Sequence, residues 1–137
     1  MSHYLACKEA DSFAAVSPAA FDLVQEVECK PSRPISVISF RGTADAIVSY
    51  AGGYSVPPTG YPLDPINFLG AEGTFEKWAE INGCTGEPED GVAGAGCRTY
   101  TKCNAGVEVT LCTAQGGSHV GGDPNVAWPM LNKHPMP

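Results

Sequence analysis

The apolar segment Ile35-Ser36-Val37-Ile38-Ser39-Phe40 leads directly into the polar turn Arg41-Gly42-Thr43-Ala44-Asp45. β-Branched side chains dominate the segment and favour an extended backbone, so we predict a buried strand over residues 35–40. The glycine and threonine that follow favour a turn, which presents the carboxyl group of Asp45 just beyond the strand. Asp45 is therefore the first candidate functional residue.

A second apolar run, Val107-Glu108-Val109-Thr110-Leu111, precedes a glycine-rich turn, Gly116-Gly117-Ser118-His119. An acid after one strand and a histidine after a later one is the order of the last two members of a Ser…Asp…His triad in α/β-hydrolases. A carboxylate that holds one imidazole nitrogen prepares the other to act as a general base. Two alternatives remain open from the residues alone: a turn-forming Asp45, and a loop His119 with no catalytic role.

The rest of the chain alternates between helical and extended patterns. Ala71, Phe75 and Trp78 fall on one face of a helix predicted over 71–82, for which Gly83 is a stop signal. Further helices are expected over 2–10 and 126–133, and further strands over 13–17, 99–101 and 107–113. This order predicts an α/β fold in one domain, 1–137, with a small, mostly parallel sheet, flanking helices and long loops, of which 46–69 is the longest. Functional residues of parallel sheets lie at the carboxyl ends of strands, where Asp45 and His119 fall.

Composition limits the class of protein. Fifteen acidic and eight basic residues give a net charge of −7, which argues against nucleic acid or an anionic membrane as a partner. Six cysteines without a Cys-x-x-Cys pair favour disulfides and an oxidising, extracellular location. Their spacing alone does not choose the pairing, and buried free thiols remain an alternative. The start of the chain does not read as a signal peptide.

Other candidate residues carry weaker signals. We expect His3 and His134 to be exposed to solvent, and the three histidines lack a metal-binding spacing. Phe75 and Trp78 are expected in the core, and Trp128 in the core or at a pocket edge. No Gly-x-Ser-x-Gly nucleophile elbow occurs in the sequence.

Four segments in order carry a resemblance to a known family. They are Leu5–Asp11 with Phe13–Pro18, Arg41–Asp45 with Tyr50–Gly53, Trp78–Cys84, and Gly116–His119. On these segments the chain resembles the C-terminal half of the polyhydroxybutyrate depolymerase and feruloyl-esterase-like family of secreted α/β-hydrolases. The resemblance covers nearly the whole chain.

The resemblance implies a function and a set of site residues. Asp45 would be the triad acid and His119 the triad base of a carboxylic ester hydrolase, acting on a small or polymeric ester without cofactor or metal. The serine elbow would lie just upstream of Met1, so the chain would be the C-terminal part of a catalytic domain, inactive alone and missing an N-terminal half. The resemblance also suggests disulfides Cys84–Cys103 and Cys7–Cys29, and it leaves Cys97 and Cys112 bonded to each other or free.

Two departures from the family fall near the site. Arg41 stands where the family usually has a histidine, and Val120-Gly121-Gly122 replaces Trp-Pro-Gly after the histidine of the triad. Both are expected to touch the substrate pocket. The alternative function is a secreted, non-catalytic binding module that retains the second half of the fold. A truncated gene product without a role is a third interpretation.

Overall fold

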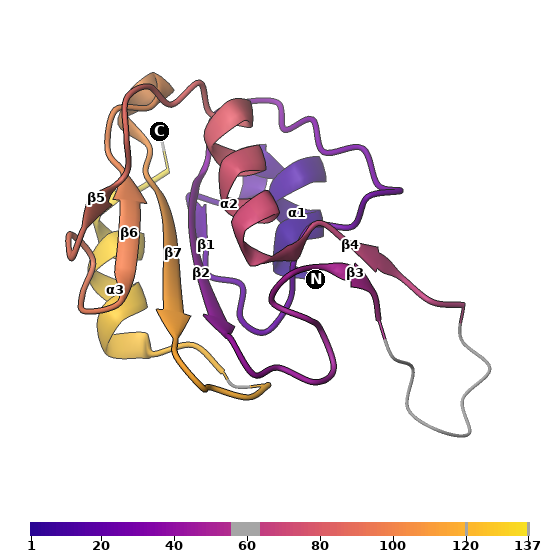
Figure 1. Ribbon diagram of the computed structural model, residues 1–137. Coiled ribbons are helices and arrows are strands. Elements are labelled where there is room, and N and C mark those ends of the chain that lie inside the picture. Colours follow the sequence, from indigo (N-terminus) through magenta and orange to yellow (C-terminus); the bar gives the residue numbers. More distant parts are fainter. Residues whose placement is uncertain (56–63, 120, 137) are drawn as a thin grey trace.

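A five-stranded sheet runs through the protein in the order β1-β2-β7-β6-β5 (Figure 1). The computed structural model describes residues 1–55, 64–119 and 121–136. The strands of this sheet are β1 (Ala15–Val16), β2 (Ser36–Gly42), β5 (Glu89–Asp90), β6 (Cys97–Tyr100) and β7 (Val109–Ala114). The helices are α1 (Ser2–Lys8), α2 (Gly70–Ile81) and α3 (Pro124–Lys133), with short 3-10 turns η1 (Ala10–Ser12) and η2 (Asn104–Gly106). A separate hairpin pairs β3 (Gly53–Tyr54) with β4 (Asn67–Phe68).

The α/β class is confirmed, but the sheet is mixed rather than mostly parallel. β2 runs parallel to both β1 and β7, whereas β6 runs antiparallel to both β7 and β5. Only residues 101–108 separate β6 from β7. A parallel crossover needs a dozen residues or more, so a connection of this length returns the chain as an antiparallel neighbour.

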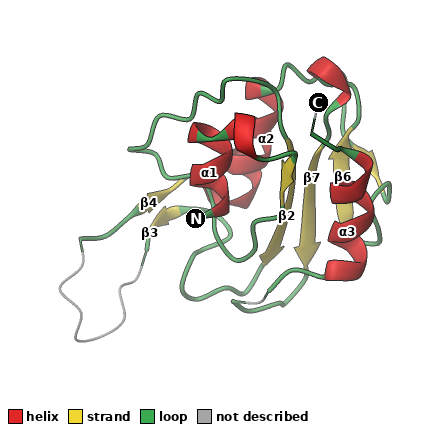
Figure 2. Cartoon of the chain, turned by 180° about the vertical axis from the view of Figure 1, so that it is seen from behind, coloured by secondary structure: helices red, strands yellow, loops and turns green. Residues whose placement is uncertain are grey.

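Helices cover both faces of the sheet. α1 and α2 lie on one face and α3 lies on the other, as the front and rear views show (Figures 1 and 2). Alternate residues of β2 enter different cores because successive side chains of a strand point to opposite faces. Val37 packs with Phe75 and Trp78 under α2, whereas Ile38 packs with Met130 of α3. Because helices cover both faces, all seven residues of β2 are buried, including Ser36, Ser39 and Arg41.

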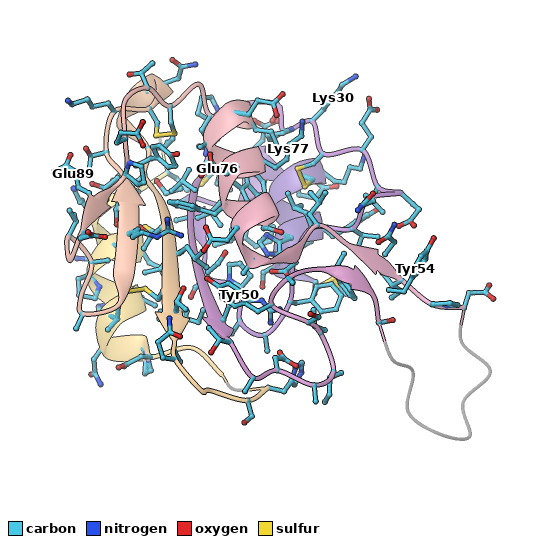
Figure 3. The ribbon with its side chains drawn as sticks, viewed as in Figure 1. Lys30, Tyr50, Tyr54, Glu76, Lys77 and Glu89 are labelled. Atoms are coloured by element: carbon cyan, nitrogen blue, oxygen red, sulfur yellow. A yellow bond between two sulfur atoms is a disulfide. The ribbon has the colours of Figure 1, made fainter. Side chains whose placement is uncertain are left out.

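Three disulfides close the chain on itself, and they are drawn in yellow in Figure 3. They join Cys7 to Cys29, Cys84 to Cys103, and Cys97 to Cys112. The first two are the pairs that the family resemblance suggests, and the third shows that Cys97 and Cys112 are bonded to each other. All six thiols are therefore consumed, as is typical of a protein from an oxidising compartment.

Both terminal histidines differ from expectation. His3 is buried, 4% exposed, because α1 packs it against Trp78, whose indole Nε1 donates to Nδ1 at 3.0 Å. The side chain of His134 is 13% exposed and its Nε2 lies 3.1 Å from Glu108 Oε2. The prediction that these two histidines are solvated is therefore wrong.

Trp128 lies outside the core, which was one of the two positions expected for it. It is 65% exposed, whereas its neighbours Ala127 and Met130 form the buried side of α3. Residues 127 and 130 share a helix face because they are three apart, and residue 128 is rotated away from that face. Phe75 and Trp78 are buried, as predicted.

The predicted long loop, 46–69, contains the β3–β4 hairpin, and residues 56–63 of it lie outside the described part of the chain, as does Val120. α2 ends where predicted, because Gly83 adopts a left-handed φ of 62° just after Asn82. None of the helices in the described ranges has the length and apolar character that a membrane span requires.

Candidate active site

The site begins with two parallel strands that end side by side. β2 and β7 are in register along their whole pairing, and Gly42 lies opposite Ala114 at the carboxyl ends. The turns that follow are joined by backbone hydrogen bonds from Thr43 N to Ala114 O at 3.1 Å and from Ala44 N to Gly117 O at 2.8 Å. Thr43 Oγ1 also accepts from Gly116 N at 2.8 Å. These bonds fix the turn that carries Asp45 against the turn that carries His119.

Gly42 makes this close approach possible. A Cβ atom at this position would collide with the carbonyl oxygens of Gly117 and Ser118. Glycine is therefore required where the backbone of one turn passes directly over the end of β2.

Asp45 is held by its own turn. Its Oδ1 accepts hydrogen bonds from the N–H groups of Ile47 and Val48, both at 2.9 Å, and its side chain is fully buried. Burial acts to raise the pKa of Asp45, but the hydrogen bonds from Val48, Ile47, His119 and Arg41 outweigh burial and lower the pKa below its usual value. The carboxyl group is therefore ionised at neutral pH.

His119 meets this carboxylate. Its Nδ1 lies 2.9 Å from Asp45 Oδ2 and 3.2 Å from Oδ1, and its side chain is 39% exposed. An ionised carboxylate only accepts hydrogen bonds, so Nδ1 carries a proton, and in the neutral imidazole it is Nε2 that has the lone pair. Among the residues that the structure describes, none is hydrogen-bonded to Nε2, and a carboxylate-held imidazole in this state at a partly exposed edge is suited to accept a proton from a reactant.

Arg41 is the residue that the sequence analysis misplaced. It is 1% exposed, so its side chain is not available to contact a substrate, and its Nη1 donates to Asp45 Oδ2 at 3.0 Å. Its Nη2 donates to the carbonyl oxygens of Val48 at 2.8 Å and Ser49 at 3.3 Å. A charged residue at the end of an otherwise apolar strand, four residues before an acid, was the available sequence signal, since a buried charge needs a partner.

Asp22 is the second carboxylate at this arginine, and the sequence analysis did not single it out. Its Oδ1 lies 3.0 Å from Arg41 Nε, and both side chains are buried. The contact is an ion pair whose angles fall short of a hydrogen bond. Burial raises the pKa of Asp22 to about 6, with Arg41 opposing that rise.

Tyr50, labelled in Figure 3, connects α2 with β7. Its hydroxyl group lies 2.8 Å from Thr113 Oγ1 of β7 and donates to Glu72 Oε1 at 2.8 Å. Burial raises the pKa of Tyr50, so its phenol stays protonated in the neutral range. Within the described ranges no three side chains are grouped as a metal site would require.

The full length of the chain can be compared with a curated relative. It is similar to feruloyl esterase B of Piromyces equi. The two are 44% identical over 141 residues, which covers 100% of this chain and 26% of the relative. The chain thus spans about a quarter of the length of that esterase. No protein-family model and no solved structure matches the chain.

Proposed function

We propose that the chain carries the acid and the base of a serine carboxylic ester hydrolase of the polyhydroxybutyrate depolymerase and feruloyl esterase type. Asp45 is the acid and His119 the base. The observation that carries the proposal is the 2.9 Å contact between His119 Nδ1 and Asp45 Oδ2 beyond two adjacent parallel strands. Similarity to feruloyl esterase B supports an ester as the substrate.

In this proposal the 137 residues are a C-terminal part of an α/β-hydrolase catalytic domain. The serine, the oxyanion hole and the first strands belong to sequence that these residues do not include. Two observations support this: no Gly-x-Ser-x-Gly occurs in the chain, and every cysteine is in a disulfide and so is not available as a nucleophile. The three disulfides support an extracellular location.

Each residue of the pair has a role in the proposed reaction. His119 Nε2 takes the proton of the serine hydroxyl as the serine oxygen attacks the ester carbonyl. The bond to the alcohol oxygen then breaks, and the imidazolium returns the proton to the leaving alcohol. A water molecule then attacks the acyl-enzyme while His119 Nε2 takes its proton. The bond to the serine oxygen breaks, the imidazolium returns the proton to that oxygen, and the carboxylic acid product is released. Asp45 stays ionised throughout and stabilises the imidazolium.

The test is complementation. The chain is fused to, or co-expressed with, a segment that carries a serine elbow, drawn from feruloyl esterase B outside the matched part, and hydrolysis of p-nitrophenyl acetate and methyl ferulate is measured. We expect background rates for the chain alone and turnover after complementation. His119→Ala and Asp45→Asn should each lower kcat of the complemented protein by about 10⁴-fold. His134→Ala is the matched control, because His134 contacts Glu108 and not Asp45.

Two outcomes contradict the proposal. Turnover that survives His119→Ala would remove His119 from the reaction. A complemented protein that folds and binds the ester but does not cleave it would favour the non-catalytic binding module.

A further inference from the structure

The buried guanidinium of Arg41 lies between two carboxylates. Its Nε faces Asp22 Oδ1 and its Nη1 faces Asp45 Oδ2, each at 3.0 Å, and the three side chains are 0–1% exposed. Its Nη2 is bonded to the carbonyl oxygens of Val48 and Ser49. Nη1 and Nη2 thus donate hydrogen bonds, and Nε has an ion-pair contact with Asp22, so the buried charge is compensated by two carboxylates.

Arg41 also closes a ring with the Asp45 turn. Val48 donates its N–H to Asp45 Oδ1 and accepts from Arg41 Nη2 through its carbonyl oxygen. Asp45 Oδ2 is then the oxygen that meets both Arg41 and His119. Rotation of the carboxylate would break contacts at both of its oxygens, so the arginine fixes the direction from which His119 is held.

The charges explain why a second acid is present. Arg41 alone beside Asp45 would cancel the negative charge that stabilises a protonated His119. Asp22 restores it, because the two carboxylates and one guanidinium sum to −1. Arg41 also acts on His3 of α1: burial is the main cause that lowers the pKa of His3 to about 4, and the charges of the Met1 amino group and of Arg41 add to it, so this imidazole is neutral and adds no charge to the three groups.

We propose that Arg41 and Asp22 are positioning residues for His119: Arg41 fixes the orientation of the Asp45 carboxylate, and Asp22 offsets the guanidinium so that Asp45 keeps its negative charge toward the imidazole. This role rests on the proposed function, in which His119 is the base. Neither residue touches the substrate.

The first experiment needs no ester hydrolysis. The ¹⁵N shifts of His119 report which imidazole nitrogen carries the proton in the folded chain as it stands. We expect the Nδ1–H tautomer in the wild type and a mixture in Arg41→Gln. The double variant Asp22→Asn with Arg41→Gln keeps the summed charge of the three groups at −1 and leaves no pair of buried carboxylates, so we expect it to fold and to show the same mixture. Arg98→Gln is the matched control, because Arg98 pairs with Glu72 on a partly exposed part of β6.

The second experiment uses the complemented protein. Arg41→Gln and the double variant should lower kcat about 10–100-fold with KM unchanged, the cost of a misplaced catalytic group. Arg41→Lys should recover part of this loss, since lysine keeps the charge but lacks the fork that reaches both acids. Asp22→Asn should keep the wild-type tautomer and lower kcat about tenfold, because it removes charge and not geometry.

The results separate the two proposals. A wild-type tautomer in the folded double variant would overturn the positioning role, and so would failure of every Arg41 variant to fold, which would assign Arg41 to stability alone. A mixed tautomer in that variant together with an inactive complemented protein would support the positioning of His119 and count against the esterase function.

Discussion

The indole of Trp78 on α2 donates a hydrogen bond to Nδ1 of His3 on α1. On the other side of the ring, Nε2 of His3 lies 3.1 Å from the carbonyl oxygen of Phe21, so Nε2 carries the proton and the imidazole is neutral. The two helices are thereby joined through a histidine that has no free lone pair. His3 and Trp78 are 75 residues apart in the sequence.

This neutral histidine makes stability sensitive to acid. Burial lowers the pKa of His3 from 6.5 to about 4, so the unfolded chain binds the proton more tightly than the folded chain. The stability that depends on neutral His3 is complete above about pH 6.5 and is lost as the pH falls toward 4. His3→Gln removes this titration, while the amide keeps an acceptor and a donor for the two partners. Urea unfolding at pH 7 and pH 4 should show the wild type losing roughly 3 kcal/mol relative to the variant.

The comparison with the variant is needed because Asp22 acts in the opposite direction. Its pKa is raised from 3.8 to about 6, so the folded chain binds that proton more tightly and the contribution of Asp22 to stability decreases as the pH rises through this range. Asp22 is present in both proteins and cancels in the difference. Tyr4→Phe, on the exposed side of α1, is the control. Parallel curves for the wild type and His3→Gln would contradict the prediction.

Asn82 supplies a second stability test. Its side chain is fully buried, accepts from Ile35 N at 3.1 Å and donates to Ile35 O at 2.9 Å. The amide thus supplies the hydrogen-bond partners that a neighbouring strand would give to the residue before β2. Asn82→Ala leaves both backbone groups of Ile35 buried without a partner, and we expect a loss of about 2–4 kcal/mol in urea unfolding. Asn125→Ala, at an exposed position of α3, should change stability by less than about 0.5 kcal/mol. Equal losses for the two variants would be inconsistent with this role of Asn82.

Gly42 gives a test of how the site is assembled. In Gly42→Ala the new methyl group displaces the Gly117–Ser118 backbone, and with it His119. We expect loss of the single Nδ1–H tautomer of His119 and a decrease of about 100-fold in kcat of the complemented protein. Gly121→Ala, two residues after His119, is the matched control, because a Cβ there meets no atom within 4 Å. An unchanged tautomer in Gly42→Ala would show that the two turns adjust independently.

The disulfides can be tested directly. Peptide mapping without reduction should yield three linked pairs and no free thiol. Replacing both Cys97 and Cys112 with alanine should lower the free energy of unfolding by about 3 kcal/mol, because the unfolded chain gains freedom when the loop is opened. Any linked peptides other than the three pairs would contradict the structure.

Local sequence was enough to predict the elements of the site. β-Branched residues between Ile35 and Phe40 mark β2, and the spacing of Ala71, Phe75 and Trp78 marks the buried side of α2. Asp45 and His119 follow their strands directly, and the parallel pairing of β2 with β7 brings the two together. That part of the geometry needs only the direction of two strands.

Contacts between distant segments escaped the sequence analysis. The burial of Arg41 depends on Asp22, which lies in an irregular segment before β2 and carries no motif of its own. The burial of His3 depends on a helix 75 residues away. The burial of Arg41 and of His3 cannot be predicted from their sequence neighbours, because a charged or polar side chain is stable in the core only when a suitable partner lies beside it in the folded chain. The antiparallel pairing of β6 with β7, by contrast, could have been predicted from the sequence, because the connection over 101–108 is too short for a parallel crossover.

The same sheet topology orders the folding of the chain. Thr99 and Thr110, which meet across β6 and β7, are 11 residues apart, whereas Ser36 and Glu108, which meet where β2 and β7 begin, are 72 apart. Closing the longer loop costs about 1.7 kcal/mol more chain entropy, so we expect the local hairpin to form before the parallel pairing. Asp45 and His119 lie beyond that slow pairing. We therefore expect the imidazole to reach its carboxylate only after the most distant contacts of the sheet are made, and a chain with the hairpin alone would leave one edge of β7 uncovered and prone to associate with other chains.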